Sequence, residues 1–216
     1  MNRADAEILW EAASVLARDA AKVSRARDRP GPNLPPLLFF TDPDRTPRPW
    51  ETAARLPVGS GVVFRHFGRT DARETALRLM EATRGRDGRL LIGLDAELAE
   101  AVGADGVHLP ERALDQAVGL AAARPDWIIT GAAHSRATSA TPGLDALIVS
   151  PVFSAGGASA DRPALGLTTF ASWVETAPYP VYALGGIHSG NAHSLIGSGA
   201  FGIAGVSAIQ AAFGPD

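Results

Sequence analysis

Short apolar runs recur along most of the chain, and amphipathic segments separate them. The apolar runs predict eight strands, at residues 37–41, 62–66, 90–94, 107–109, 127–130, 146–152, 181–184 and 201–204. Between them, apolar residues at helical spacing predict helices at 72–83, 96–102, 114–123 and 168–176. Strands that alternate with helices at this spacing indicate parallel strands joined by crossover helices.

Eight such units predict an α/β fold, a (β/α)8 TIM barrel whose functional residues lie on the loops that follow the strands. An open doubly wound sheet is the alternative, but no G-x-G-x-x-G motif follows the first strand. The segment 135–141, after the fifth strand, contains too few apolar residues to predict a helix there.

The first 36 residues follow a different pattern. Apolar positions at helical spacing predict a helix over 4–28, and prolines and glycines break that pattern before residue 37. We therefore expect an N-terminal helix and a Pro-rich linker over 1–36, followed by the barrel over 37–216. An apolar stripe on one helix cannot be buried alone, so it packs either on its own barrel, where it could close the bottom, or on a second subunit of a homodimer.

The composition fits one domain with few classes of partner. The chain has 216 residues, 46% of them hydrophobic, which suits a single large core. A formal net charge of −3 gives no broad cationic surface, so we expect no nucleic acid partner. No apolar run approaches the roughly 20 residues of a membrane span, and the N-terminus lacks the apolar core of a signal peptide. We expect a cytoplasmic protein that makes no membrane contact.

Two missing residue types restrict the chemistry. The chain has no cysteine, which excludes disulfides, thiolate metal sites and a cysteine nucleophile. Its single lysine, Lys22, lies far upstream of every candidate site, so Schiff-base catalysis from a barrel strand is effectively excluded. Anions must then be bound by arginines, backbone N–H groups and helix N-termini.

Glycines cluster at the ends of the last two predicted strands. Gly185 and Gly186 follow the seventh strand and let the backbone approach a ligand closely. The eighth strand ends at Gly205, and Val206 and Ser207 can begin a short helix whose free N–H groups face the same space. In TIM barrels these two loops recurrently form a phosphate-binding cup. We expect a phosphorylated small molecule to bind at Gly185, Gly186, Val206 and Ser207, although the glycines could also serve only as tight turns.

Several motifs occur in an order that resembles the thiamine phosphate synthase/TenI superfamily. They are Thr41-Asp42-Pro43, the run from Gly103 to Leu109, Pro151-Val152-Phe153, and the two glycine-rich runs above. The resemblance covers about residues 37–209 and implies a (β/α)8 barrel of thiamine biosynthesis. Such an enzyme either couples a pyrimidine diphosphate to a thiazole phosphate, with loss of pyrophosphate, or rearranges the thiazole phosphate itself.

The chain departs from the synthase pattern where that branch binds Mg²⁺ and pyrophosphate. The family's Asn-Asp pair after the third strand reads Gly93-Leu94, and its second metal-binding aspartate is replaced by Ala113. The nearest carboxylates are Asp95 and Glu111. The Gln-x-Arg-x-Lys motif at the second strand keeps only its arginine, Arg65. The loop after Phe153 has lost its lysine and is now glycine-rich, and we expect Gly156 and Gly157 to contact substrate.

These departures favour the TenI branch, a thiazole tautomerase that works without a metal. The resemblance places its acid/base histidine at His134, in the His-Ser pair after the fifth strand. An imidazole titrates near neutrality, so His134 can remove and return a proton. Arg65 should point into the barrel mouth, where it can hold a carboxylate or phosphate. Alternatively, it forms a salt bridge to Asp42, Asp95 or Glu111.

We therefore expect a TenI-like enzyme with His134 as its catalyst and no cofactor. One alternative is a divergent thiamine phosphate synthase in which Asp95 and Glu111 hold Mg²⁺. Another is a non-catalytic barrel that binds a phosphorylated ligand. His66 should face away from the mouth by strand alternation, and His108 should be a core residue.

Overall fold

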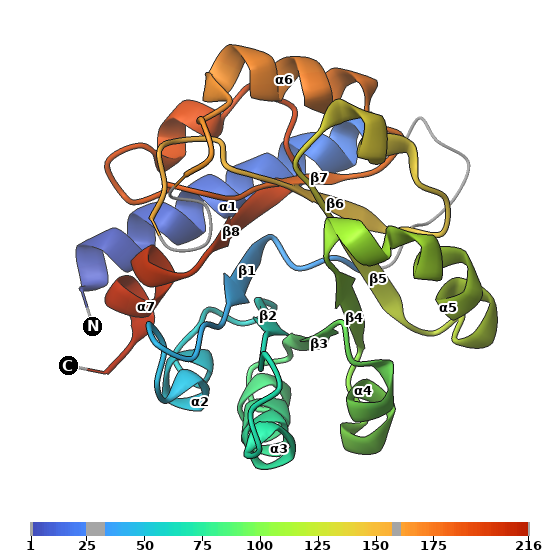
Figure 1. Cartoon of the computed structure of the whole chain (residues 1–216). Coiled ribbons are helices and arrows are strands. Elements are labelled where there is room, and N and C mark those ends of the chain that lie inside the picture. Colours follow the sequence, from blue (N-terminus) through green and yellow to red (C-terminus); the bar gives the residue numbers. More distant parts are fainter. Residues whose placement is uncertain (1, 25–32, 157–160, 216) are drawn as a thin grey trace.

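The computed structural model describes residues 2–24, 33–156 and 161–215. Eight parallel strands pair in sequence order and close into a barrel, with β1 hydrogen-bonded to β8 (Figure 1). The strands are β1 (Leu37–Phe40), β2 (Gly61–Phe64), β3 (Arg89–Gly93), β4 (Gly106–Leu109), β5 (Ile128–Ala133), β6 (Ala146–Val149), β7 (Val181–Ala183) and β8 (Gly202–Gly205). The predicted (β/α)8 barrel is confirmed.

Helical segments of uneven length follow the strands. They are α2 (Pro49–Ala53), α3 (Ala72–Arg84), α4 (Ala96–Val102), η1 (Glu111–Gln116), α5 (Ala117–Ala123), η2 (Arg136–Ala140), α6 (Gly166–Thr176), η4 (Ala192–Leu195) and α7 (Ser207–Phe213), where η marks a 3₁₀ helix. The single helix predicted over 114–123 is wrong in part, because the chain begins there as the 3₁₀ helix η1 and becomes α-helical only at Ala117.

Strand alternation divides the core into two layers. Outward-facing residues such as Leu37 and Phe39 pack under the helices, whereas Leu38 and Phe40 belong to a separate cluster inside the barrel. Tyr182 is fully buried in that inner cluster, and its hydroxyl donates to the carbonyl of Pro35 at 2.6 Å. The inner layer therefore fills the barrel and leaves its open, functional end to the residues that follow the strands.

The N-terminal helix α1 (Arg3–Ser24) packs on the barrel itself. It contacts β8, α7 and η4, and Figure 1 shows it running along β8 on the outside of the barrel. Its apolar stripe, which includes Leu9, Ala12 and Leu16, is buried in the outer core layer. Helix α1 thus covers strand surface that the one-turn η4 leaves open, and it does not close the barrel bottom. The last predicted helical residues, 25–28, lie outside the described residues.

No helix in the described parts of the chain is both long and apolar enough to cross a membrane.

Candidate functional site

Alternation along the strands brings three polar side chains to the barrel mouth. Arg65 continues the inward positions of β2, two residues beyond the inner-core residue Val63. His134 and Ser150 likewise continue the inward positions of β5 and β6, and they meet at the mouth. Side chains from neighbouring parallel strands therefore converge where barrels carry their chemistry.

His134 is held by the end of β6. Its Nδ1 lies 3.0 Å from the carbonyl oxygen of Ser150 and 3.2 Å from the Ser150 hydroxyl. A carbonyl can only accept, so this contact requires that Nδ1 carry the proton and donate it. The other ring nitrogen, Nε2, is then unprotonated in the neutral ring and can accept a proton from a ligand.

Glu111 fixes the backbone around His134. One carboxylate oxygen accepts hydrogen bonds from the His134 backbone N–H at 3.3 Å, the Ser135 hydroxyl at 3.2 Å and the Thr138 hydroxyl at 2.7 Å. Partial burial acts to raise the pKa of Glu111, but the hydrogen bonds from Thr138, His134 and Ser135 outweigh it and lower that pKa. Glu111 is therefore a carboxylate that orders the β5–η2 loop.

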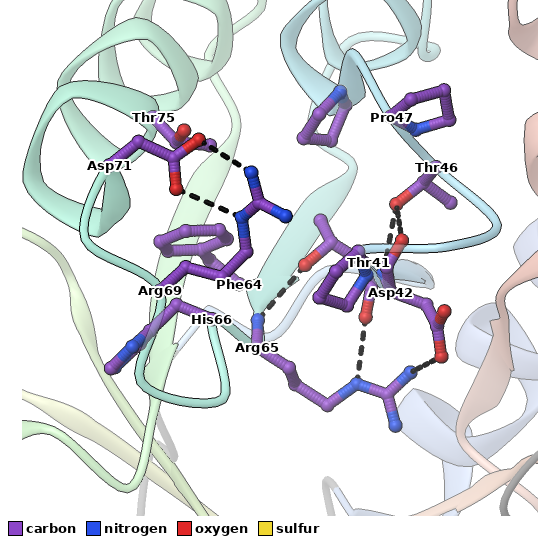
Figure 2. Close-up of a pocket in the computed structure, with 12 residues that line it drawn as sticks. Thr41, Asp42, Thr46, Pro47, Phe64, Arg65, His66, Arg69, Asp71 and Thr75 are labelled. Carbon is purple, nitrogen blue, oxygen red and sulfur yellow. Dashed lines mark hydrogen bonds and ion pairs between the residues drawn. The ribbon is translucent and has the colours of Figure 1, made fainter.

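Two arginines share one carboxylate at the mouth. Asp42 accepts a hydrogen bond from Arg45 Nη2 at 2.9 Å, and Arg65 Nη2 lies 3.8 Å from the same oxygen. At 3.8 Å, Arg65 and Asp42 form an ion pair, but the two atoms are too far apart for a hydrogen bond. Arg65 Nη2 is therefore buried without a hydrogen-bond partner. Arg65 Nε donates to the Thr41 carbonyl at 2.8 Å, which anchors the guanidinium (Figure 2).

This cluster carries a net charge of +1. Although partial burial acts to raise the pKa of Asp42, hydrogen bonds and charge from Arg45 and the charge of Arg65 hold it below its usual value. Burial lowers the pKa of Arg65 to about 10, and Arg45 adds to that effect while Asp42 opposes it. Arg65 thus stays cationic at neutral pH, and two guanidinium groups beside a single carboxylate are an arrangement suited to an anionic ligand.

Gly185 and Gly186 follow β7 in conformations that favour glycine. Their φ angles are +99° and +65°. A Cβ on Gly185 would lie 2.7 Å from Cα of Pro151, and a Cβ on Gly186 would collide with the carbonyl oxygen of Ser154. Their N–H groups donate to no other described residue. The chain therefore requires glycine at both positions, and their amides are available to a ligand.

Helix α7 begins directly after β8, at Ser207, as the sequence suggested. Its first N–H groups are not used within the helix, because Gln210 N–H makes the first helical bond, to the carbonyl of Val206. Arg45 reaches over from the β1–α2 loop, and its Nη1 donates to the Ser207 hydroxyl at 3.4 Å. A cation beside the positive end of a helix is unfavourable by itself, so an anion between them would stabilise this contact.

Two other histidines are engaged within the protein. His108 is buried, its Nδ1 lies 3.0 Å from the Thr130 hydroxyl, and burial lowers its pKa to about 3, with smaller contributions from Arg65 and His134. It is a neutral core residue, as expected. His66 does turn away from the mouth, but its Nε2 lies 3.2 Å from Asp95, which joins the loops after β2 and β3.

The two glycines predicted to contact substrate follow β6 in the sequence. Gly156 is exposed in the loop after β6, and Gly157 lies outside the described residues. His188 precedes the short η4, and His193 on η4 pairs with Glu11 at 3.6 Å. A binding role for the glycines therefore stays a prediction.

A cavity of about 160 Å³ lies beside the mouth, between the loops after β1 and β2. Figure 2 shows Thr46 and Pro47 on one side of it, and Arg69 paired with Asp71 on the other. Neither His134 nor the glycine-rich ends of β7 and β8 line it. It is therefore separate from the predicted phosphate cup.

The residues at the family's metal positions do not fit Mg²⁺. Leu94 and Ala113 offer no side-chain oxygen. Asp95 uses one oxygen to cap α4 at Leu98 N–H and the other to contact His66. The described residues contain no group of three or more carboxylates and histidines that could hold an ion.

Sequence reasoning missed Arg45 and Ser150. Ser150 could have been found by extending the alternation of β6 by two residues, from Ile148. Arg45 gave no such signal, because it lies in a turn that Asp42 shapes by accepting from the backbone N–H groups of Asp44 and Arg45.

Comparison with known proteins identifies the family. The pattern of the family described as thiamine monophosphate synthase matches residues 51–209. A putative thiamine-phosphate synthase 2 of Aquifex aeolicus is 37% identical over 121 residues, which cover 55% of this chain and only 64% of that protein. The thiamine-phosphate synthase of Haloarcula marismortui is 31% identical over 76% of this chain and 82% of its own length.

A solved structure of thiamine phosphate pyrophosphorylase from Pyrococcus furiosus has the same fold. It superposes with a TM-score of 0.69 and 26% sequence identity, and the match covers 85% of this chain and 89% of that one. The barrel, the family pattern and these relatives agree, and the chain belongs to the thiamine monophosphate synthase family.

Proposed function

We propose that this protein is an enzyme of thiamine metabolism that binds a thiazole phosphate, with the phosphate between the ends of β7 and β8. The observation that carries the proposal is the convergence there of the amides of Gly185 and Gly186, the start of α7 and the cation of Arg45. Backbone N–H groups, a helix N-terminus and a guanidinium together suit a phosphate dianion.

The relatives' names support the coupling reaction. In that reaction the thiazole nitrogen forms a C–N bond to the methylene carbon of a pyrimidine diphosphate, and the C–O bond to the departing pyrophosphate breaks. Arg65, a cation at the mouth with a donor that lacks a hydrogen-bond partner, is placed to stabilise part of the negative charge that develops. No step through Mg²⁺ is derived, because the residues present do not fit it.

The geometry of His134 supports a second candidate, proton transfer on the thiazole phosphate. With Nδ1–H donated to the Ser150 carbonyl, Nε2 is the free base of the mouth. This reaction needs one group that removes a proton from one ring position and returns it to another, and it needs neither metal nor a leaving group.

One protein preparation distinguishes the two reactions. The coupling assay supplies pyrimidine diphosphate and thiazole phosphate and measures pyrophosphate release. The isomerisation assay supplies the thiazole carboxylate phosphate tautomer alone and follows it by NMR in D₂O. Turnover in one assay assigns the reaction, and binding of thiazole phosphate without turnover in either would make the protein a binding module.

We expect Arg45→Met to weaken the binding of inorganic phosphate about tenfold or more, because it removes the cation beside Ser207. Isothermal titration at low and high salt measures the effect, and the salt dependence should fall with the lost charge. Arg48→Met is the matched control, since Arg48 is more exposed and pairs with Glu51 at 3.0 Å. Equal phosphate affinity in both variants would contradict the role of Arg45.

We expect the protein to add no saturable Mg²⁺ binding beyond that of pyrophosphate alone, because Leu94 and Ala113 lack ligand oxygens and Asp95 is engaged by His66 and Leu98. Isothermal titration of the wild-type protein is the measurement. Saturable binding that Asp95→Asn abolishes would show that Asp95 leaves its partners for the metal, and would favour the metal-dependent coupling reaction.

A further inference from the structure

Two large apolar side chains are exposed at the ends of neighbouring strands. Phe67, in the loop after β2, is 70% exposed, and Leu94, directly after β3, is 40% exposed. Neither belongs to the core clusters of the described residues. The other exposed large apolar residues are on helices or at loops away from the mouth: Val58, Leu77, Val118 and Ile196.

Both residues also have an unfavourable backbone conformation. Phe67 has φ +48° and Leu94 has φ +61°, in the left-handed region that bulky side chains rarely adopt. Glycine or asparagine would hold either turn at less cost, and burial of these exposed side chains within the fold does not offset the strain. Residues with a strained backbone of this kind cluster at ligand sites, where a functional role of the side chain keeps them in place despite the strain.

The mouth cation Arg65 lies beside Phe67 and beside Gly93, the residue before Leu94. The Arg65 guanidinium carbon is 5.6 Å from the centre of the Phe67 ring and 5.5 Å from that of Phe40. A Cβ on Gly93, the residue before Leu94, would lie 3.3 Å from Cγ of Arg65, so the stem of Arg65 occupies the space that a larger residue would need. Phe67, Arg65 and the end of β3 therefore form one surface.

We infer that Phe67 and Leu94 form an apolar subsite for an uncharged heteroaromatic ring of the phosphorylated ligand. This inference deepens the proposed function, because the phosphate cup holds the other end of that ligand. An aromatic ring would be stabilised here by stacking on Phe67 and by a cation–π contact with the adjacent Arg65 guanidinium. A diphosphate would instead lose bound water at this apolar surface, where Phe67 and Leu94 offer no polar groups to replace it. The family's metal and lysine positions correspond to Leu94 and Phe67, so the subsite replaces an ionic one.

The test uses Phe67→Asn/Leu94→Asn, because asparagine tolerates the left-handed conformation and removes the apolar surface. The probes are thiazole phosphate, inorganic phosphate and the unphosphorylated hydroxyethylthiazole. We expect thiazole phosphate and hydroxyethylthiazole to bind about tenfold more weakly, inorganic phosphate to bind as in the wild type, and the melting temperature to stay equal or rise. Leu77→Gln on α3 is the control for loss of an exposed apolar side chain.

Three results would overturn the inference. Unchanged affinity for both ring compounds would show that no ring binds there. A clearly lower melting temperature with intact ring binding would assign Phe67 and Leu94 to stability. Dissociation of a wild-type dimer on substitution, seen by light scattering, would assign them to an interface between two copies. If instead the proposed phosphate cup does not exist, the wild-type protein would bind thiazole phosphate and hydroxyethylthiazole equally well, which is a different result from the three above.

Discussion

Replacing His134 with asparagine is expected to lower turnover of the thiazole phosphate in the isomerisation assay by about 100-fold or more, the range typical of a positioned acid or base. The asparagine amide can still donate to the Ser150 carbonyl in place of Nδ1–H, so the mouth should keep its shape. What the variant loses is Nε2, the atom that would accept the proton. Single-turnover kinetics and the affinity for inorganic phosphate measure the two effects separately.

The phosphate affinity of His134→Asn should stay close to that of the wild type, because the cup is built from the ends of β7 and β8. His193→Asn is the matched control, since that imidazole is half exposed on η4 and lies outside the mouth. Wild-type turnover in His134→Asn would exclude the imidazole as the acid/base. Coupling activity in a protein that does not isomerise its substrate would favour the synthase reaction.

The barrel could be predicted because its strands are short apolar runs at regular spacing, and periodicity is the strongest local signal in a sequence. Individual bounds were less accurate. The predicted strand 146–152 ends earlier, at Val149, and Pro151 has no backbone N–H with which to extend the ladder. The path of α1 along β8 could not be predicted, because an apolar stripe does not say which surface covers it.

The mouth of the site was partly predictable, by strand alternation. That rule places Arg65 inward and turns His66 outward, as the structure has them. The family resemblance supplied His134, because the predicted fifth strand ended at residue 130, whereas β5 continues to Ala133. Strand alternation says nothing about loops, and the key loop contact here joins Arg45 to Ser207, residues 162 positions apart in the chain. Such a contact depends on barrel closure between β1 and β8, which local patterns do not encode.

Sequence patterns alone do not decide between the two reactions. Missing metal and lysine positions favoured the TenI branch, yet the comparable proteins carry synthase names, and that preference is not confirmed. The proposed phosphate cup and the proposed ring subsite bear on this choice. Glycines with positive φ follow β7, whereas the exposed apolar residues Phe67 and Leu94 follow β2 and β3.

Replacing Gly186 with alanine is expected to raise the dissociation constant for inorganic phosphate at least tenfold and to lower the free energy of unfolding by about 2 kcal/mol or more. The left-handed conformation alone costs a residue with a side chain roughly 1–2 kcal/mol. The added methyl would also collide with the Ser154 carbonyl and lie 2.8 Å from Cβ of Phe153. Either the β7 end or the loop after β6 must then move, and the Gly186 amide moves with it. Titration below the melting temperature and denaturant unfolding measure the two effects.

The variant Gly197→Ala is the control that separates the cost of a left-handed backbone from the collision with Ser154. Gly197 has φ +86°, but an added Cβ would have no atom within 4 Å, so that variant should lose stability from the left-handed conformation alone and keep its phosphate affinity. The difference between the two variants then reports the contact of Gly186 with Ser154 and its effect on the cup. A Gly186→Ala protein that is destabilised more than Gly197→Ala, and that still binds phosphate like the wild type, would place the anion elsewhere, because the amides of the β7 end cannot hold it unchanged after the loop has shifted.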